Sequence, residues 1–334
     1  MKAWVLSEPA PVEDAPLQLE QRPLPQPGSE QLRLRVHACG VCHTDLHLVE
    51  GELPQPALPV VPGHQVVGVV DALGDGVTGW EMGERAGVPW LGYTCGVCSF
   101  CHSGRENLCE SARFTGYQAD GGYAEYVLVH ADYAVRIPPA FSDAAAAPLL
   151  CAGTVGYRSL RLSGLQPGER LGIYGFGGSG HLCIQVARYW GCEVYVFTRS
   201  VEHQQHAREL NAAWVGVASE TPPAQLDRAI IFAPAGWLVP LSLGYLRPGG
   251  SLCINAIHAS PIPEMPYRLL WKERTITTVA NATRRDAREF MELAAEAGVA
   301  TQVQPFPMRA ANEVLQQLKH GRTTGSAVLI VREN

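Results

Sequence analysis

The chain lacks a long apolar run and a basic leader. Its least polar stretch, residues 144–157, is too short to cross a bilayer and contains Pro148, Gly153 and Gly156. The amino terminus MKAWVLSEPAPVED carries acids and prolines where a signal peptide would be basic and then apolar. We therefore expect no membrane association and a cytoplasmic location.

An excess of basic residues is also missing. Lys and Arg total 26, Asp and Glu total 32, and the net charge is −6. Because nucleic acid and anionic lipid both require a basic protein surface, neither is expected as a partner. The chain shows no internal repeat or low-complexity tract, and its 334 residues exceed one ordinary domain, so we expect two.

Cysteine, in contrast, is abundant, with ten residues. Disulfides are rare in a reducing cytoplasm, so metal binding or catalysis is the better expectation.

The hydrophobic pattern changes near residue 150. Before it, Leu32, Leu34 and Val36 alternate with Arg33, Arg35 and His37, which predicts a half-buried strand. Residues 66–73 and 122–137 are two further β-rich runs. From about residue 150 to about residue 285, strands alternate with helices, which is typical of a parallel doubly wound sheet; two further helices and a closing strand are expected after it. The expected strands are 170–174, 193–197, 227–232 and 327–331, and the expected helices are 179–190, 202–210, 286–297 and 310–320.

Four cysteines follow the spacing C-x2-C-x2-C-x7-C, at Cys95, Cys98, Cys101 and Cys109. Short C-x2-C steps let thiolates converge on one ion, and four thiolates are the ligand set of a structural zinc. An iron–sulfur cluster also takes four cysteines, although the ferredoxin spacings differ from this one. Such a closed site holds a lobe of the chain together and leaves no coordination position for chemistry.

A second group of metal-binding residue types is dispersed along the chain. The segment 41–47, VCHTDLH, holds Cys42, and His64 and Cys151 follow much later. Each residue alone is a weak signal, because a lone histidine or cysteine is more often a packing residue. Spacing by itself leaves open whether the three meet.

A glycine-rich turn lies between an expected strand and an expected helix. Gly175, Gly177, Gly178 and Gly180 belong to the segment GFGGSG, which matches the dinucleotide-binding pattern G-x-G-x-x-G. The glycines permit close approach of backbone to a pyrophosphate at the helix amino terminus.

The end of the next expected strand predicts which dinucleotide binds. An NAD-binding fold usually carries an acid there, but this chain has Thr198, Arg199 and Ser200. A cation and two hydroxyls favour a 2′-phosphate, so we predict NADP over NAD. The alternative is that Arg199 is a solvated surface charge.

Five segments in order resemble the zinc-dependent alcohol dehydrogenases of the medium-chain dehydrogenase/reductase family: CGVCHTDLH, PGHQVVG, WLGYTCGVCSFCHSGRENLC, PLLCAGT and GFGGSGH. The likeness covers essentially the whole chain. It implies an α/β protein with a Rossmann dinucleotide-binding domain at 153–284. A β-rich, chaperonin-10-like (GroES-like) catalytic domain would comprise 1–152, with the structural zinc lobe at 90–110, and 285–334. The resemblance also implies a homo-oligomer, dimer or tetramer.

The resemblance further implies two zinc ions per chain. Cys42, His64 and Cys151 would hold the catalytic zinc, with one position open for substrate. Thr44 would take the proton of the substrate hydroxyl, and His47 would receive it through the cofactor ribose. Asp45 would orient His64, and His43 would face the pyrophosphate. For Thr44 and Asp45 a turn or a helix cap is the alternative.

By the same likeness, Leu53 and Trp90 would line a substrate cleft for small alcohols and aldehydes, although Trp90 could equally be core. Two departures from the family pattern are Gln65, where a glutamate is usual, and Ser326, where a basic residue is usual. The expected function is reversible hydride transfer between an alcohol and NADP(H) or NAD(H). The alternatives are a zinc-free quinone or enoyl reductase of the same fold, and a non-catalytic redox sensor that binds zinc and dinucleotide.

Overall fold

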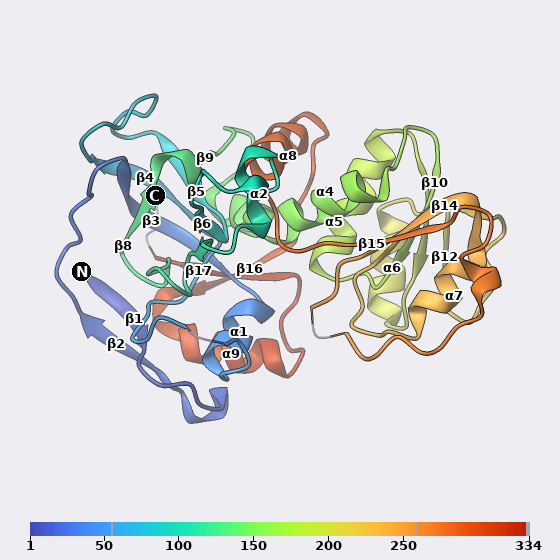
Figure 1. Cartoon of the computed structure of the whole chain (residues 1–334). Coiled ribbons are helices and arrows are strands. Elements are labelled where there is room, and N and C mark those ends of the chain that lie inside the picture. Colours follow the sequence, from blue (N-terminus) through green and yellow to red (C-terminus); the bar gives the residue numbers. More distant parts are fainter. Residues whose placement is uncertain (55, 258, 332–334) are drawn as a thin grey trace. The chain divides into compact units, whose positions relative to one another are not determined.

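The computed structural model describes residues 1–54, 56–257 and 259–331, and this part of the chain divides into two compact units (Figure 1). Unit 1 comprises residues 1–151, 283–295 and the chain from Ala300 onward, and unit 2 comprises residues 152–282 and 296–299. The domain boundaries expected from the sequence lie between residues 152 and 153 and between residues 284 and 285. Within the described ranges, no helix is both long and apolar enough to cross a membrane.

Unit 1 is built mainly of strands. Its strands are β1 (Lys2–Leu6), β2 (Leu17–Gln21), β3 (Gln31–Val41), β4 (Val66–Leu73), β5 (Arg85–Val88), β6 (Leu91–Tyr93), β7 (Arg113–Phe114), β8 (Tyr126–His130), β9 (Val135–Arg136), β16 (Val303–Pro307) and β17 (Ser326–Ile330). Its helices are α1 (His43–Val49), α2 (Ser99–His102), α3 (Asp143–Ala146), α8 (Arg284–Glu296) and α9 (Ala311–Lys319).

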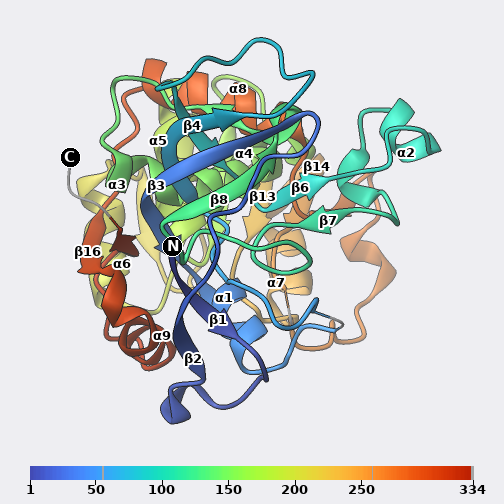
Figure 2. The ribbon, with the colours of Figure 1, turned by 90° about the vertical axis from the view of Figure 1, so that its left-hand side faces the viewer.

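The long strand β3 organises the seven-stranded sheet of unit 1. The order is β16-β17-β3-β4-β5-β9, and β8 also pairs with β3. Figure 2 shows β8 running beside β3. Buried apolar side chains of β3, β4 and β8 form one core with Val314 and Leu315 of α9. In the antiparallel pair of β3 and β4, Cys39 lies opposite Val66. The chain that leaves β3 therefore meets the chain that enters β4, which positions the first metal-ligand candidates.

The alternation predicted for β3 is right at five of its six positions. Leu32, Leu34 and Val36 are buried, and the two arginines between them are half-buried. His37 is the exception, because it too is buried. Its Nδ1 lies 2.8 Å from Oδ2 of Asp143, and Arg85 donates to the other oxygen of this carboxylate. The hydrogen bond with His37 lowers the pKa of Asp143 to about 2, and Arg85 contributes in the same direction. Burial of the carboxylate opposes this shift. His37 can therefore be buried because Asp143, which is distant in sequence, provides a hydrogen-bond partner for its ring. The local alternation of β3 predicts an exposed position and gives no sign of this partner.

The predicted β-rich run over 122–137 is less regular than expected. The structure divides it into β8, a 3-10 helix over Ala131–Tyr133 and the two-residue β9. The helix begins where the His130 side chain accepts a hydrogen bond from the Asp132 amide. A local side-chain cap therefore interrupts what composition alone suggests is one strand.

Unit 2 has the predicted doubly wound, parallel arrangement. Its six strands follow the order β12-β11-β10-β13-β14-β15, and all neighbours are parallel. This is the Rossmann order, in which ligands bind at the carboxyl ends of strands where the winding reverses, between β10 and β13. The elements are α4 (Ala152–Ser163), β10 (Arg170–Tyr174), α5 (Gly178–Tyr189), β11 (Glu193–Phe197), α6 (Val201–Glu209), β12 (Trp214–Gly216), β13 (Leu226–Ile231), α7 (Leu238–Tyr245), β14 (Leu246–Ile254) and β15 (Thr275–Thr278).

The predicted elements match the structure closely. Strands 170–174 and 193–197 have the predicted bounds, as does β4, and the four predicted helices differ by one or two residues at each end. Helix α5 ends before Gly191, whose φ of +76° is the left-handed conformation that closes many helices.

Candidate metal centres and cofactor loop

Three elements of unit 1 bring Cys42, His64 and Cys151 together. Cys42 follows β3, and His64 precedes β4 by two residues, so the antiparallel register makes them neighbours. Cys151 follows a 3-10 helix over Ala147–Leu150, whose two leucines are buried. One sulfur or ring nitrogen from each of the three residues lies within 4.8 Å of the others.

The centre combines a buried imidazole with two partly exposed thiols. The Cys42 Sγ lies 3.4 Å from His64 Nε2, and His64 is 1% exposed. The pKa of the Cys42 thiol is held well below its usual range, mainly by its interaction with Cys151 and also by the charge of His64. Burial acts in the opposite direction but is outweighed. Although burial opposes it, the charges of Asp45 and Cys42 raise the pKa of His64 to about 10. Two sulfurs and a ring nitrogen are a donor set that suits a soft metal ion.

Asp45 connects the helix start to the imidazole. Its Oδ2 accepts from the Cys42 amide at 2.9 Å, and its Oδ1 lies 3.1 Å from His64 Nδ1. The Gly63 amide also donates to Oδ1, at 3.2 Å. The contact to Nδ1 directs the other ring nitrogen, Nε2, toward Cys42. Asp45 closes the capping box of α1 as well, so the cap and the ligand-orienting role coincide.

The other polar residues of α1 differ in exposure. The Thr44 amide lies 3.4 Å from the Cys42 Sγ, and Thr44 is partly exposed. His43 is exposed, and its ring centroid lies 6.4 Å from that of His47. The Nδ1 of His47 contacts the carboxylate of Glu52, a partner that the sequence analysis missed. Hydrophobic periodicity gives no sign of a side-chain contact such as this one, in which one residue lies in α1 and the other beyond its end.

The predicted cleft residues both pack on the core of unit 1. Leu53 is partly buried, and Trp90 lies edge-on to the ring of His64, with 4.9 Å between centroids. Phe114 and Tyr117 stack on Trp90 at 5.0 and 5.7 Å, and neither was singled out from the sequence. An aromatic wall of Trp90, Phe114 and Tyr117 therefore adjoins His64.

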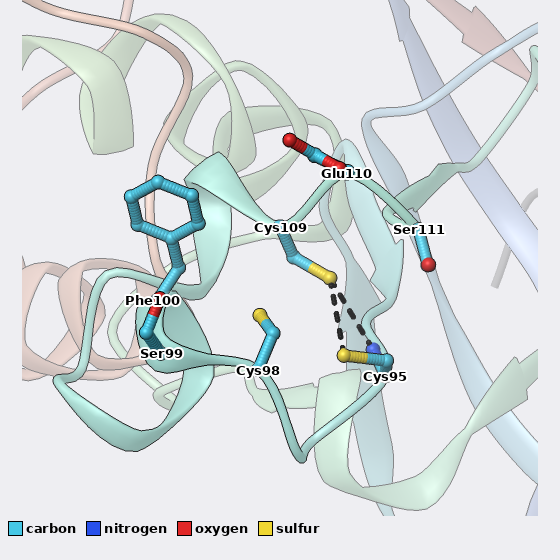
Figure 3. Close-up of a pocket in the computed structure, with 7 residues that line it drawn as sticks. All are labelled: Cys95, Cys98, Ser99, Phe100, Cys109, Glu110 and Ser111. Atoms are coloured by element: carbon cyan, nitrogen blue, oxygen red, sulfur yellow. Dashed lines mark hydrogen bonds between the residues drawn. The ribbon is translucent and has the colours of Figure 1, made fainter.

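The four-cysteine spacing produces a compact group of sulfurs. Cys98 and Cys101 lie 3.5 Å apart, as do Cys95 and Cys109, and the four sulfurs are within 4.8 Å of one another. Figure 3 shows the side chains of Cys95, Cys98 and Cys109 turned toward a common point, with Phe100 and Glu110 turned away. Backbone amides at Val97 and Cys98 lower the pKa of Cys95 to about 6.

Both groups fit zinc by geometry and by donor chemistry. A tetrahedral site with Zn–S bonds of about 2.3 Å has sulfur–sulfur edges of about 3.8 Å. The sulfur contacts in the four-cysteine group are 3.5–3.9 Å, and no disulfide links any of the ten cysteines, all of which are among the described residues. The other group offers two thiols and one imidazole, which is a catalytic ligand set that leaves one position open.

The glycine loop of unit 2 joins β10 to α5. Gly175 has φ of +92°, and a Cβ there would lie 2.8 Å from the Ala233 amide nitrogen. At Gly180 a Cβ would lie 2.7 Å from the carbonyl oxygen of Gly175. A Cβ on Gly177 would meet no described atom within 4 Å, and no described side chain caps the first turn of α5. The loop therefore presents amides beside open space, which fits a pyrophosphate. Gly178 lies in the same first turn.

The end of β11 presents the residues predicted to contact the adenosine ribose. Thr198 is 8% exposed, and Arg199 is exposed with no salt bridge to any described residue. The Ser200 hydroxyl caps α6 by accepting from the His203 amide at 3.2 Å. This hydroxyl therefore has a structural role besides the predicted contact with a phosphate.

The two departures from the family pattern occupy different environments. Gln65 is 3% exposed, and its Nε2 has no hydrogen-bond partner in the described structure. A Cβ on Gly40 would lie 2.6 Å from the Gln65 amide oxygen, so glycine makes room for it. Ser326 begins β17, and its amide donates to Gln302.

Comparisons with known proteins agree along the whole chain. Residues 28–139 match a family model described as the alcohol dehydrogenase GroES-like domain, and residues 178–296 match one described as zinc-binding dehydrogenase. A probable alcohol dehydrogenase, AdhA, of Mycobacterium tuberculosis is 45% identical over 99% of this chain and 97% of its own length.

Solved structures are similar over the same extent. A cinnamyl alcohol dehydrogenase, SbCAD4, from Sorghum bicolor has a TM-score of 0.89 and 28% identity, covering 98% of this chain and 97% of its own. An acetophenone reductase from Geotrichum candidum, solved in complex with NAD, has a TM-score of 0.87 and 26% identity, covering 99% and 97%.

Proposed function

Since this chain belongs to the zinc-dependent alcohol dehydrogenases of the medium-chain dehydrogenase/reductase family, we propose that it transfers hydride reversibly between a small alcohol or aldehyde and NADP(H), using Cys42, His64 and Cys151 as its catalytic zinc ligands. The convergence of these three side chains within 4.8 Å carries the proposal. Cys95, Cys98, Cys101 and Cys109 would hold a second, structural zinc.

The chemistry depends on groups that the chain binds. When bound, zinc supplies a Lewis acid for an alcohol or carbonyl oxygen, and the nicotinamide supplies the hydride acceptor or donor. The chain's own residues hold and orient these groups and move the proton.

Asp45 has the clearest positioning role. Its contact with His64 Nδ1 selects the tautomer whose Nε2 lone pair is available to a metal. Its contacts with the amides of Cys42 and Gly63 hold the carboxylate still. The ring of Trp90 packs on His64 and, together with Leu53, supports an apolar substrate site.

The activity itself is tested by alcohol-dependent reduction of NADP+ and NAD+. We expect turnover with small aliphatic or aromatic alcohols that disappears when a chelator removes the metal and returns with Zn2+. A zinc-free quinone or enoyl reductase would instead oxidise NADPH with a quinone or enone and keep that activity after complete metal removal, and a redox sensor would turn over neither kind of substrate. Metal analysis of the same samples should give two zinc ions per chain.

For the proton, we propose a relay from Thr44 to His47. A hydroxyl both donates and accepts, and Thr44 is adjacent to the ligand Cys42 on a partly exposed turn. His47, held by Glu52 at the protein surface, can exchange a proton with water.

Thr44→Val keeps the shape of the side chain and removes the hydroxyl. We expect kcat for alcohol oxidation to fall by roughly 10²-fold, as for the loss of a general acid–base group, with the zinc content unchanged. Thr44→Ser, which keeps the hydroxyl, should retain most of the activity. Equal kcat in Thr44→Val and the parent enzyme would exclude the relay.

Arg199, Thr198 and Ser200 support NADP as the preferred cofactor. The guanidinium is exposed and has no acidic partner among the described residues, so it is available to a 2′-phosphate. His43 is exposed and lies next to Cys42 in the chain, so its side chain is available to the pyrophosphate of the cofactor.

Arg199→Asp should reverse the cofactor preference. A charge-assisted hydrogen bond contributes about 1.5–3 kcal/mol, so its replacement by repulsion should change the NADP-to-NAD ratio of kcat/KM by roughly 10²-fold. Arg208→Asp, on the exposed face of α6, is the matched control and should leave the ratio unchanged. A clear preference of the parent enzyme for NAD would contradict the proposal.

A homo-oligomer and a cytoplasmic location stay predictions. The apolar side chains of unit 2 support the first, because Trp237, Ile257, Ile262, Tyr267 and Trp271 are 49–69% exposed. Exposed apolar surface of this kind is typical of protein–protein contacts.

A further inference from the structure

A buried phenol adjoins the Asp45 network and was given no role by the sequence. Tyr123 is 0% exposed and is one of the largest fully buried side chains. Its ring packs directly on Gly63, where a Cβ would lie 2.4 Å from the Tyr123 Cδ1. The Gly63 φ of +97° and this contact both require glycine. Tyr123 is thus fixed against the residue that precedes the ligand histidine.

The backbone holds Tyr123 in this position from both sides. Its amide donates to the Pro62 carbonyl at 2.9 Å, and its carbonyl accepts from Trp4 at 2.8 Å. The neighbouring Gly122 amide donates to the carbonyl of Gly63. The ring therefore has little freedom to turn its hydroxyl toward solvent.

The hydroxyl of Tyr123 is buried and has no hydrogen-bond partner within the described residues. A buried polar group left in this state costs about 1–3 kcal/mol. Burial first, and then the charge of Asp45, raise the pKa of Tyr123 well above its ordinary value, so the hydroxyl keeps its proton and can act only as a donor toward an anion.

Asp45 has room for one further donor. Its Oδ1 already accepts from Gly63 and lies against His64 Nδ1, whereas Oδ2 accepts from the Cys42 amide. A carboxylate oxygen can accept two hydrogen bonds. Burial raises the pKa of the neighbouring Cys39 thiol, which is therefore a weak acceptor, and the Cys42 sulfur is a ligand of the proposed zinc.

We propose that Tyr123 is a positioning residue: in the zinc-loaded protein its hydroxyl donates to the remaining lone pair of the Asp45 carboxylate and thereby holds the Asp45–His64 pair in the geometry that retains the metal. The inference rests on the proposed function, because it assumes a zinc at Cys42, His64 and Cys151. It extends the ligand-orienting chain by one step, from phenol to carboxylate to imidazole.

The test is the rate of zinc release from the holoenzyme to an excess of a chromophoric chelator. Tyr123→Phe keeps the ring against Gly63 and deletes one oxygen. We expect the zinc at Cys42, His64 and Cys151 to leave roughly tenfold faster, as for the loss of other outer partners of metal ligands. Release from the four-cysteine group should not change.

Tyr174→Phe is the matched control. Tyr174 is also fully buried, its hydroxyl also lacks a partner among the described residues, and it belongs to unit 2. Both variants should show similar thermal unfolding, but only Tyr123→Phe should alter zinc release. With Co2+ in place of zinc, only Tyr123→Phe should alter the visible absorption of the metal.

A double-mutant cycle decides whether Tyr123 acts through Asp45. Asp45→Asn should accelerate release by itself, and adding Tyr123→Phe to it should change the rate by less than about twofold. An equal tenfold effect of Tyr123→Phe with and without Asp45 would overturn the inference, as would equal rates in Tyr123→Phe and the parent holoenzyme. A parent enzyme with zinc only in the four-cysteine group would instead overturn the proposed function, and this inference with it.

Discussion

The Cys151→Ser variant should lose one zinc per chain and roughly 10³-fold or more of its kcat/KM for alcohol oxidation. Lewis-acid stabilisation of the developing alkoxide contributes several kcal/mol, and each 1.36 kcal/mol corresponds to about tenfold in rate. Serine is a poor substitute because zinc prefers a thiolate to a neutral hydroxyl. The Cys151 sulfur also lies within 4.8 Å of the Cys42 sulfur, so the substitution changes the surroundings of a second candidate ligand.

The matched control is Cys39→Ser. Cys39 is fully buried and lies three residues before Cys42, but it is outside the group of three ligand atoms. We expect this variant to keep two zinc ions and most of its activity. Metal analysis of both proteins, with steady-state kinetics, separates the two cases. Full activity in a Cys151→Ser enzyme that retains one zinc would refute the assigned ligand set.

Cys98→Ser should lose the other zinc and unfold at a markedly lower temperature. The segment 90–110 has short elements and a small core, because α2 has four residues and β6 has three. Val97 is 77% exposed, and Leu108 is 38% exposed. Since few apolar contacts hold this segment, we expect a bound metal to supply most of its stability.

The expected loss is on the order of 4 kcal/mol, as for removal of a structural metal. At about 2–4 °C per kcal/mol, the unfolding midpoint should fall by roughly 10 °C. Val97→Ser, a polar substitution at an exposed position in the same segment, should leave the midpoint within about 1 °C. Limited proteolysis should cut Cys98→Ser within 90–110 first. The prediction fails if Cys98→Ser keeps two zinc ions and has the same unfolding midpoint as Val97→Ser.

Short separations along the chain explain why some features could be predicted from the sequence. The four cysteines lie within fifteen residues, and the loop from Gly175 to Gly180 lies between a strand and a helix that hydrophobic period already indicates. In both cases the interacting groups are close in sequence, so the chain has few ways to separate them. The same reasoning located β10 and β11 with their observed bounds.

Other features depend on long-range pairing. Spacing left open whether Cys42, His64 and Cys151 meet, and the resemblance alone suggested it. The structure brings Cys42 and His64 together through the register of β3 on β4. The same dependence explains why His37 was placed on the polar side, since its partner Asp143 is 106 residues away.

The aromatic wall around Trp90 and the buried phenol of Tyr123 also depend on contacts between residues that are distant in sequence. Phe114 and Tyr117 reach Trp90 only because β6 and β7 pair, and Tyr123 reaches Gly63 through a contact between loops that are distant in sequence. Hydrophobic periodicity reports which face of an element is buried, but it carries no information about the partner on that face.

The sequence by itself determined the two kinds of unit, the parallel α/β winding, the four-cysteine cluster and the glycine turn, because each depends on residues close along the chain. Only the tertiary structure decided which distant side chains surround His64 and which donors reach Asp45. Those contacts depend on strand register and on loop packing, and a shift of one residue in register would turn each side chain to the opposite face.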